Sequence, residues 1–115
     1  MEKKIQLLFP ECAVEVKATL FEDEAPLSCK AVWQFLEEPM EANLRNAWPA
    51  LPELYFYIPE IEDLPFENPV MFATAGDLVL YHYTRRNGQK VFDIGIYYAR
   101  GYSLIETGWG CPGTE

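Results

Sequence analysis

The feature that most constrains this sequence is a β-rich stretch at 66–83 that is followed by a second β-rich run at 91–98. In the first stretch, a polar Glu-Asn pair opens an apolar run, and a Gly-Asp pair interrupts it before a tyrosine-rich segment resumes. An Asn-Gly pair at 87–88 separates the two runs, and both residue types tolerate the positive φ angles of a tight hairpin turn. We therefore expect a loop, two strands and a returning hairpin strand at the centre of the fold.

Residue spacing predicts the elements that precede this centre. Segments 5–9 and 14–20 alternate apolar and polar residues, which is typical of a hairpin with one buried face. Apolar residues at spacings of three and four then predict one helix near 26–37, with a proline at its start and another after its end. Two short strands joined by a proline-constrained turn are expected between 40 and 58.

These segments amount to one helix and about eight short strands. The chain has 115 residues, half of them hydrophobic and 15% aromatic, so it can bury the core of one domain. Closing a sheet on itself is a way of removing exposed strand edges. We predict a mainly β fold over 1–115, a small closed or nearly closed β-barrel whose helix caps one end, with Trp33 plugging that end.

Composition argues against several classes of partner. Eighteen acidic and nine basic residues give a net charge of −9, and no concentrated basic surface is present to bind nucleic acid. No apolar run approaches the roughly 20 residues of a membrane span, and the first residues lack the core of a signal peptide, so we expect a cytoplasmic protein. Cys12, Cys29 and Cys111 fit neither a disulfide framework nor a zinc site, and with His82 as the single histidine we expect no metal and no cofactor.

Several segments resemble one group of known proteins. The run at 25–36, Ala-Pro-Leu-Ser-Cys-Lys-Ala-Val-Trp-Gln-Phe-Leu, is similar to the helix motif Ala-Pro-x-Thr-Cys-x-x-Phe/Trp-x-x-Leu of cyclophilin-like proteins. Together with further matches, it resembles a bacterial family of uncharacterised small proteins, a domain of unknown function with a cyclophilin-like barrel. The further matches are Arg45 with Trp48, the aromatic strand at 55–57, Glu67-Asn68, and Gly76-Asp77 before a tyrosine-rich strand.

Two departures from that family pattern bear on the fold. The turn after Trp48 reads Pro-Ala-Leu-Pro, where the family has glycine and an acidic residue. The family also typically adds a closing strand beyond the position of Glu115. The resemblance therefore implies a barrel with an open edge or with a strand borrowed from a neighbour, and a homo-oligomer is one expectation.

The resemblance also raises the activity of a peptidyl-prolyl isomerase, which the residues do not favour. Isomerisation requires an arginine beside an apolar proline pocket, because the step is rotation about an amide with a barrier of about 18–20 kcal/mol. Arg45 is present, but the phenylalanine- and glutamine-bearing motifs that accompany the arginine in true isomerases are not evident around it. A shared fold does not carry the activity by itself.

Three interpretations of the candidate site stay open. In the first, a barrel mouth binds a small carboxylate- or amide-bearing molecule, or the protein is accessory to a metabolic enzyme; its residues are Arg45, Trp48, Tyr55, Tyr57, Glu67 and Asn68. In the second, the protein is an enzyme acting on a small acid or cyclic amide, with Glu67 as the acid/base and Arg45 as the anion clamp. In the third, Arg45 and Glu67 form a structural ion pair, and Asn68 belongs to a turn.

Overall fold

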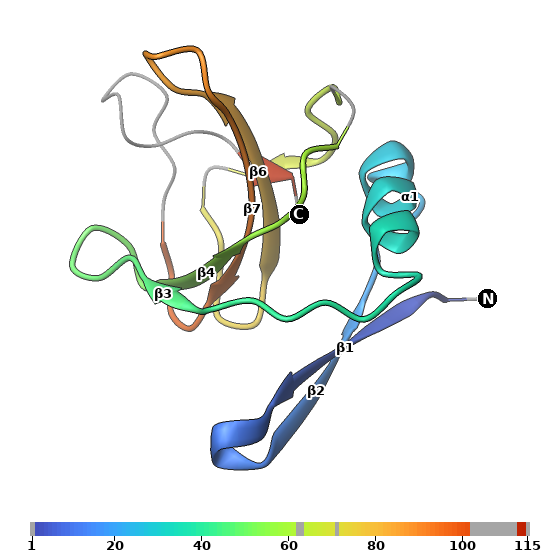
Figure 1. Cartoon of the computed structure of the whole chain (residues 1–115), viewed down its shortest axis with the longest axis vertical. Helices are drawn as coiled ribbons and strands as arrows, with labels where there is room; N and C mark the ends of the chain where they lie inside the picture. The colour runs from blue at the N-terminus through green and yellow to red at the C-terminus, as the bar shows by residue number, and fades with distance from the viewer. Residues whose placement is uncertain (1, 62–63, 71, 102–112, 115) are drawn as a thin grey trace.

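The chain folds into one α-helix and two antiparallel β-sheets (Figure 1). The computed structural model describes residues 2–61, 64–70, 72–101 and 113–114. A small sheet pairs β1 (Lys4–Phe9) with β2 (Val14–Thr19), joined through the short helix η1 (Pro10–Cys12). The larger sheet has six strands in the order β3 (Arg45–Asn46), β4 (Glu53–Tyr57), β7 (Lys90–Tyr97), β6 (Leu78–Thr84), β8 (Gly113–Thr114) and β5 (Pro69–Val70).

The long hairpin of β6 and β7 forms the centre of the larger sheet, as the sequence predicted. Seven residue pairs join these strands in register, from Leu78 with Ile96 to Thr84 with Lys90. At the turn, the Gly88 amide donates to the Arg85 carbonyl oxygen at 2.9 Å. Gly88 has a φ of +86°, a conformation that residues with a side chain rarely adopt.

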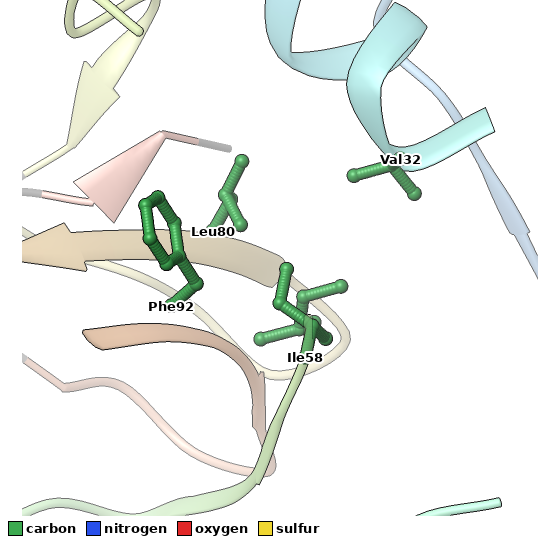
Figure 2. Close-up of a cluster of buried hydrophobic side chains, with 5 residues drawn as sticks. Val32, Ile58, Leu80 and Phe92 are labelled. Atoms are coloured by element: carbon green, nitrogen blue, oxygen red, sulfur yellow. The ribbon is translucent and has the colours of Figure 1, made fainter. Parts of the chain in front are cut away.

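Helix α1 (Pro26–Phe35) begins at the predicted proline and ends two residues before the predicted end. It lies beside one face of the six-stranded sheet (Figure 1). Figure 2 shows Val32 of this helix facing Leu80, Phe92 and Ile58, with which it forms a buried apolar cluster. Burying these side chains, each of which contributes about 1.5–3 kcal/mol when removed from water, holds the helix against the sheet.

The six-stranded sheet has an apolar face and a polar face, because side chains alternate along each strand. Even-numbered residues of β4, β6 and β7 point toward α1 and supply the apolar cluster. The odd-numbered residues share the opposite face, which we call the polar face because it carries two acids and several tyrosines. They include Glu53, Tyr55, Tyr57, Tyr81, Asp93 and Tyr97. Part of this face is apolar, since Val79 packs there with Ala73 and the rings of Tyr81 and Tyr97.

Two predictions about the barrel need revision. The described strands form two separate sheets and do not close into a barrel, because the β1–β2 hairpin extends away from the larger sheet (Figure 1). The prediction that Trp33 plugs a barrel end is wrong. Its side chain is 40% exposed, and the Lys3 ammonium nitrogen lies 5.1 Å from its ring centroid.

Two other sequence predictions concern the cysteines and membrane spans. Cys12 is exposed and Cys29 is buried, both as free thiols, whereas Cys111 lies outside the described residues. The described part of the chain contains no helix with the length and apolar character needed to cross a membrane.

Candidate functional site

Three of the predicted site residues come together on the polar face of the sheet. Arg45 of β3 pairs with Tyr55 of β4, and the Arg45 guanidinium lies over the ring of Tyr57, 5.4 Å from its centroid. The rings of Tyr55 and Tyr57 meet edge to face with centroids 5.8 Å apart, an arrangement that aromatic pairs prefer. The polar face of the sheet therefore carries the Arg45 guanidinium beside two tyrosine rings that contact each other.

Trp48 borders this group on the turn between β3 and β4. Its backbone amide donates to the Asn46 side-chain oxygen at 3.0 Å, and the Tyr98 hydroxyl donates to the same oxygen at 3.3 Å. The Trp48–Pro49 peptide bond is cis, and the indole is 65% exposed. The side chain of Trp48 is thus available to solvent at the turn between β3 and β4.

Glu67 binds the first turn of α1. Its carboxylate accepts hydrogen bonds from the Ser28 amide at 2.7 Å, the Ser28 hydroxyl at 2.8 Å and the Leu27 amide at 3.2 Å. The first amides of a helix have no partner within the helix, and Ala25 before Pro26 supplies no side-chain cap. A carboxylate forty residues away in sequence fills that role, and it also faces the positive end of the helix dipole.

The electrostatics of Glu67 agree with a structural role. Burial pushes the pKa of this carboxyl upward, but the hydrogen bonds from Ser28 and Leu27 outweigh burial and hold the pKa below its ordinary value. Asn68 follows in the left-handed conformation with a φ of 48°, which asparagine tolerates in turns. Since α1 packs on the apolar face, the Glu67 carboxylate at its first turn lies on the opposite side of the sheet from Tyr55 and Tyr57.

The polar face holds two buried carboxyl groups that the sequence analysis missed. Glu53 of β4 is 4% exposed and Asp93 of β7 is 5% exposed. Asp93 lies between Tyr57 on one neighbouring strand and Tyr81 on the other, and Glu53 pairs with Tyr97. The Tyr81 and Tyr97 hydroxyls share a hydrogen bond, so the carboxyls and tyrosines form one polar cluster.

Gly95 makes room for this cluster. It lies on the polar face of β7 between Asp93 and Tyr97, opposite Tyr55 on one side and Val79 on the other. A Cβ atom at this position would overlap the Glu53 carboxyl group. The absence of a side chain here lets Glu53 extend over the backbone of β7, as glycine permits in strands where another group approaches closely.

Burial makes both carboxyl groups weaker acids than usual. It raises the pKa of Glu53, and a hydrogen bond from the Tyr97 hydroxyl only partly offsets that rise. Burial, together with the negative charge of Glu53, raises the pKa of Asp93 to about 7, against a smaller opposing effect of Arg85. Near neutral pH, Asp93 is therefore divided between a neutral acid that donates a hydrogen bond and a carboxylate that only accepts.

A small opening exposes this cluster from the side of the β3–β4 turn. We call it the tyrosine hollow; it has a volume of about 140 Å³ and is lined by Ala47, Leu51, Glu53, Tyr55, Tyr81 and Asp93. Its surface is mainly apolar, and the carboxyl groups of Glu53 and Asp93 lie at its base. Two weak acids and two phenols can both donate and accept hydrogen bonds there.

The sequence did carry a signal for Glu53 and Asp93. Aspartate is depleted in strands, yet Asp93 stands inside a β-branched and aromatic run where a buried strand was predicted. Glu53 lies two and four residues before the tyrosines that were selected, so strand periodicity places it on their face. If the residues of each strand face are grouped separately, both acids fall in the same group as the tyrosines.

The comparisons with known proteins place the chain in a family. No curated protein matches it. Residues 7–114 match the family described as "Protein of unknown function (DUF3830)", which covers the elements that build the polar face and the helix cap. With nearly its whole length matched, the chain belongs to this family of proteins of unknown function, DUF3830.

Proposed function

We propose that this protein binds a small amide-bearing molecule in the tyrosine hollow. The observation that carries the proposal is the pair of buried carboxyl groups, Glu53 and Asp93, on adjacent strands among tyrosines. Buried acids with perturbed pKa values cluster at functional sites in proteins. The proposed ligand class is the one expected from the sequence. The proposed binding site is different, because it is built on Glu53 and Asp93 and not on Glu67.

The hydrogen-bonding capacity of the hollow suits an amide. A protonated Asp93 donates to a carbonyl oxygen, and a carboxyl oxygen of Glu53 accepts from the adjacent N–H group. An amide presents that acceptor and that donor on neighbouring atoms. The hollow has a volume of about 140 Å³, so we expect only a small group of the ligand to enter it.

A carboxylate-bearing molecule would bind differently. Its charge would meet the two acids inside the hollow, and like charges disfavour one another there. Two cations border the tyrosine rings: the Arg45 guanidinium lies over the Tyr57 ring, and Arg85 donates to the Tyr57 hydroxyl at 3.3 Å. A carboxylate is therefore expected to bind at these guanidinium groups, with only an apolar or amide portion entering the hollow.

The test uses the pH dependence of binding. We would titrate the ¹⁵N-labelled protein with acetamide, 2-pyrrolidone and acetate at pH 6, 7 and 8, and follow the amide signals of β4 and β7. Acetamide or 2-pyrrolidone should bind best at pH 6 and weaken by up to about tenfold per pH unit above 7, as Asp93 loses its proton.

Two variants sharpen the experiment. In Asp93→Asn the neutral amide cannot ionise, so any binding that remains should not change between pH 6 and pH 8. In Glu67→Gln, the matched control on the other face, binding should be unchanged. Absence of binding of every probe to the wild-type protein at pH 6, or binding with the same pH dependence in Asp93→Asn, would refute the proposal.

A second candidate function is an enzyme acting on a cyclic amide or small acid. The pKa of Asp93, raised to about 7 by burial, is close to the operating pH at which general acid–base catalysis is efficient. The acid/base role proposed for Glu67 from the sequence is therefore transferred to Asp93, with Arg45 kept as the anion clamp. Ring opening of 2-pyrrolidone or hydantoin, followed by NMR and lost in Asp93→Asn but not in Glu67→Gln, would distinguish turnover from binding alone.

Three broader expectations stay predictions: a bacterial origin, a cytoplasmic location and a cyclophilin-like barrel. What supports the barrel is the order of elements, a hairpin and then a helix at Pro26 before the remaining strands. An accessory role beside a metabolic enzyme is compatible with binding without turnover. A crystal structure would test barrel closure directly, through the pairing of the β1–β2 hairpin.

A further inference from the structure

We propose that two copies of this chain form a dimer in which the outer edges of their β2 strands pair antiparallel about a two-fold axis. The pairing would join two hairpins into a four-stranded sheet, β1–β2–β2–β1. It concerns a surface apart from the tyrosine hollow and is independent of the ligand proposal.

The β1–β2 hairpin has the features of a sheet that lacks a partner. It extends away from the body of the protein (Figure 1), and in the described part of the chain it forms a sheet of two strands. Its apolar side includes Val14 and Val16, which are 45% and 43% exposed. A two-stranded hairpin is marginally stable alone in water, and its open edges are templates for further strands.

The hydrogen bonds of the hairpin determine which residues of β2 face outward. The Leu20 amide donates to the Lys3 carbonyl oxygen at 2.9 Å, so even-numbered residues of this strand direct their amides toward β1. Because the direction alternates along an antiparallel strand, Glu15, Lys17 and Thr19 direct their backbone groups to the open edge. These residues are therefore the ones that can bond to another strand.

Charge then selects one register for self-pairing. A two-fold axis at Val16 places Glu15 opposite Lys17 of the partner subunit, twice in the dimer, and each pair lies at a hydrogen-bonding position. Moving the axis to Glu15 or to Lys17 places two like charges directly opposite each other. Opposite charges across strands stabilise a sheet and like charges destabilise it, so the axis at Val16 is favoured.

This register also brings apolar surfaces together. It places Val14, near the tip of one hairpin, beside Ala18 of the partner subunit, near the base of the other. In each copy Ala18 lines an apolar cavity of about 270 Å³ between the hairpin base, α1 and the core side of the sheet, which Leu80 and Ile94 also line. The tip of each hairpin would cover the mouth of this cavity in the other copy.

The first test is the oligomeric state of wild-type and charge-reversed proteins, measured by light scattering and sedimentation. The wild type should be a dimer. Glu15→Lys and Lys17→Glu should each weaken the dimer by at least about tenfold, because each replaces two opposite-charge pairs by like-charge pairs. The double variant Glu15→Lys/Lys17→Glu should restore it. A wild-type monomer, unaffected dimers in the single variants, or no recovery in the double variant would each overturn the proposal.

The second test is disulfide capture in a Cys12→Ser/Cys111→Ser background. The two copies of position 16 would form a non-hydrogen-bonded pair with Cα atoms about 4.5 Å apart, within the range that a disulfide spans. Val16→Cys should therefore yield a covalent dimer under mild oxidation. Thr19→Cys, matched on the same strand but about 20 Å from its own copy in this register, should not. Equal cross-linking of both variants, or of neither, would contradict the register.

Discussion

Replacing Asp93 by asparagine should remove a loss of stability that the wild-type protein suffers as the pH rises toward 7. The pKa of Asp93 is raised from an ordinary 3.8 to about 7, so between these values the folded protein holds a proton that the unfolded chain releases. The stability contributed by this group is therefore fully present at low pH and is lost as the pH rises toward 7. The loss amounts to ~4 kcal/mol in total, of which ~3 kcal/mol falls between pH 5 and pH 8.

The variant should lack that loss, because asparagine is neutral at every pH in this range. Relative to wild type, Asp93→Asn should gain ~3 kcal/mol in free energy of unfolding between pH 5 and pH 8. We would measure urea denaturation of both proteins at pH 5 and pH 8, with Asp23→Asn, an exposed aspartate, as the control for removing a charge. A stability difference between Asp93→Asn and wild type that is the same at both pH values would refute the reasoning.

Two further predictions concern groups that hold the site and the helix in place. Glu67→Ala should destabilise the protein by about 1–2 kcal/mol at pH 7 through loss of the helix cap. Because the pKa of Glu67 is lowered in the folded protein, the stability that its carboxylate contributes is present above its ordinary pKa and is lost as the pH falls through the lowered value. The urea midpoints of Glu67→Ala and wild type should therefore converge at low pH. A gap between the midpoints that stays constant with pH would contradict this. Gly95→Ala should cost about 1–3 kcal/mol and abolish acetamide binding, because its methyl group displaces the Glu53 carboxyl. Gly88→Ala, in the distant turn, should bind acetamide as the wild type does, and equal binding by both variants would argue against the tyrosine hollow.

Local patterns predicted most of the secondary structure. The helix start at Pro26, the turn at Asn87-Gly88 and the two strands around the proline-rich turn follow from residues that act on their own backbone, through fixed φ angles or tolerance of positive φ. Such effects depend on a few neighbouring residues. They can therefore be inferred from the sequence without knowing the rest of the fold.

The partners of charged side chains were harder to predict. Glu67 was expected beside Arg45, yet its carboxylate binds the first turn of α1, a contact between residues 39 and 40 apart in sequence. Nothing local distinguishes these alternatives, since a carboxylate suits a guanidinium and a helix N-terminus equally well. Arg45, Tyr55 and Tyr57, three of the six residues expected to converge, lie on one face because strand alternation and pairing bring them there.

The division of the six-stranded sheet into an apolar and a polar face has a consequence for how this family can diverge. Along β4 and β7, residues that contact the helix alternate with residues that line the tyrosine hollow. Substitutions at odd positions can therefore change what the hollow accepts while the even positions keep the helix in place. An insertion or deletion of one residue would exchange the two sets and bring Asp93 into the apolar cluster, so ligand preference in this family is expected to evolve by substitution within strands of constant length.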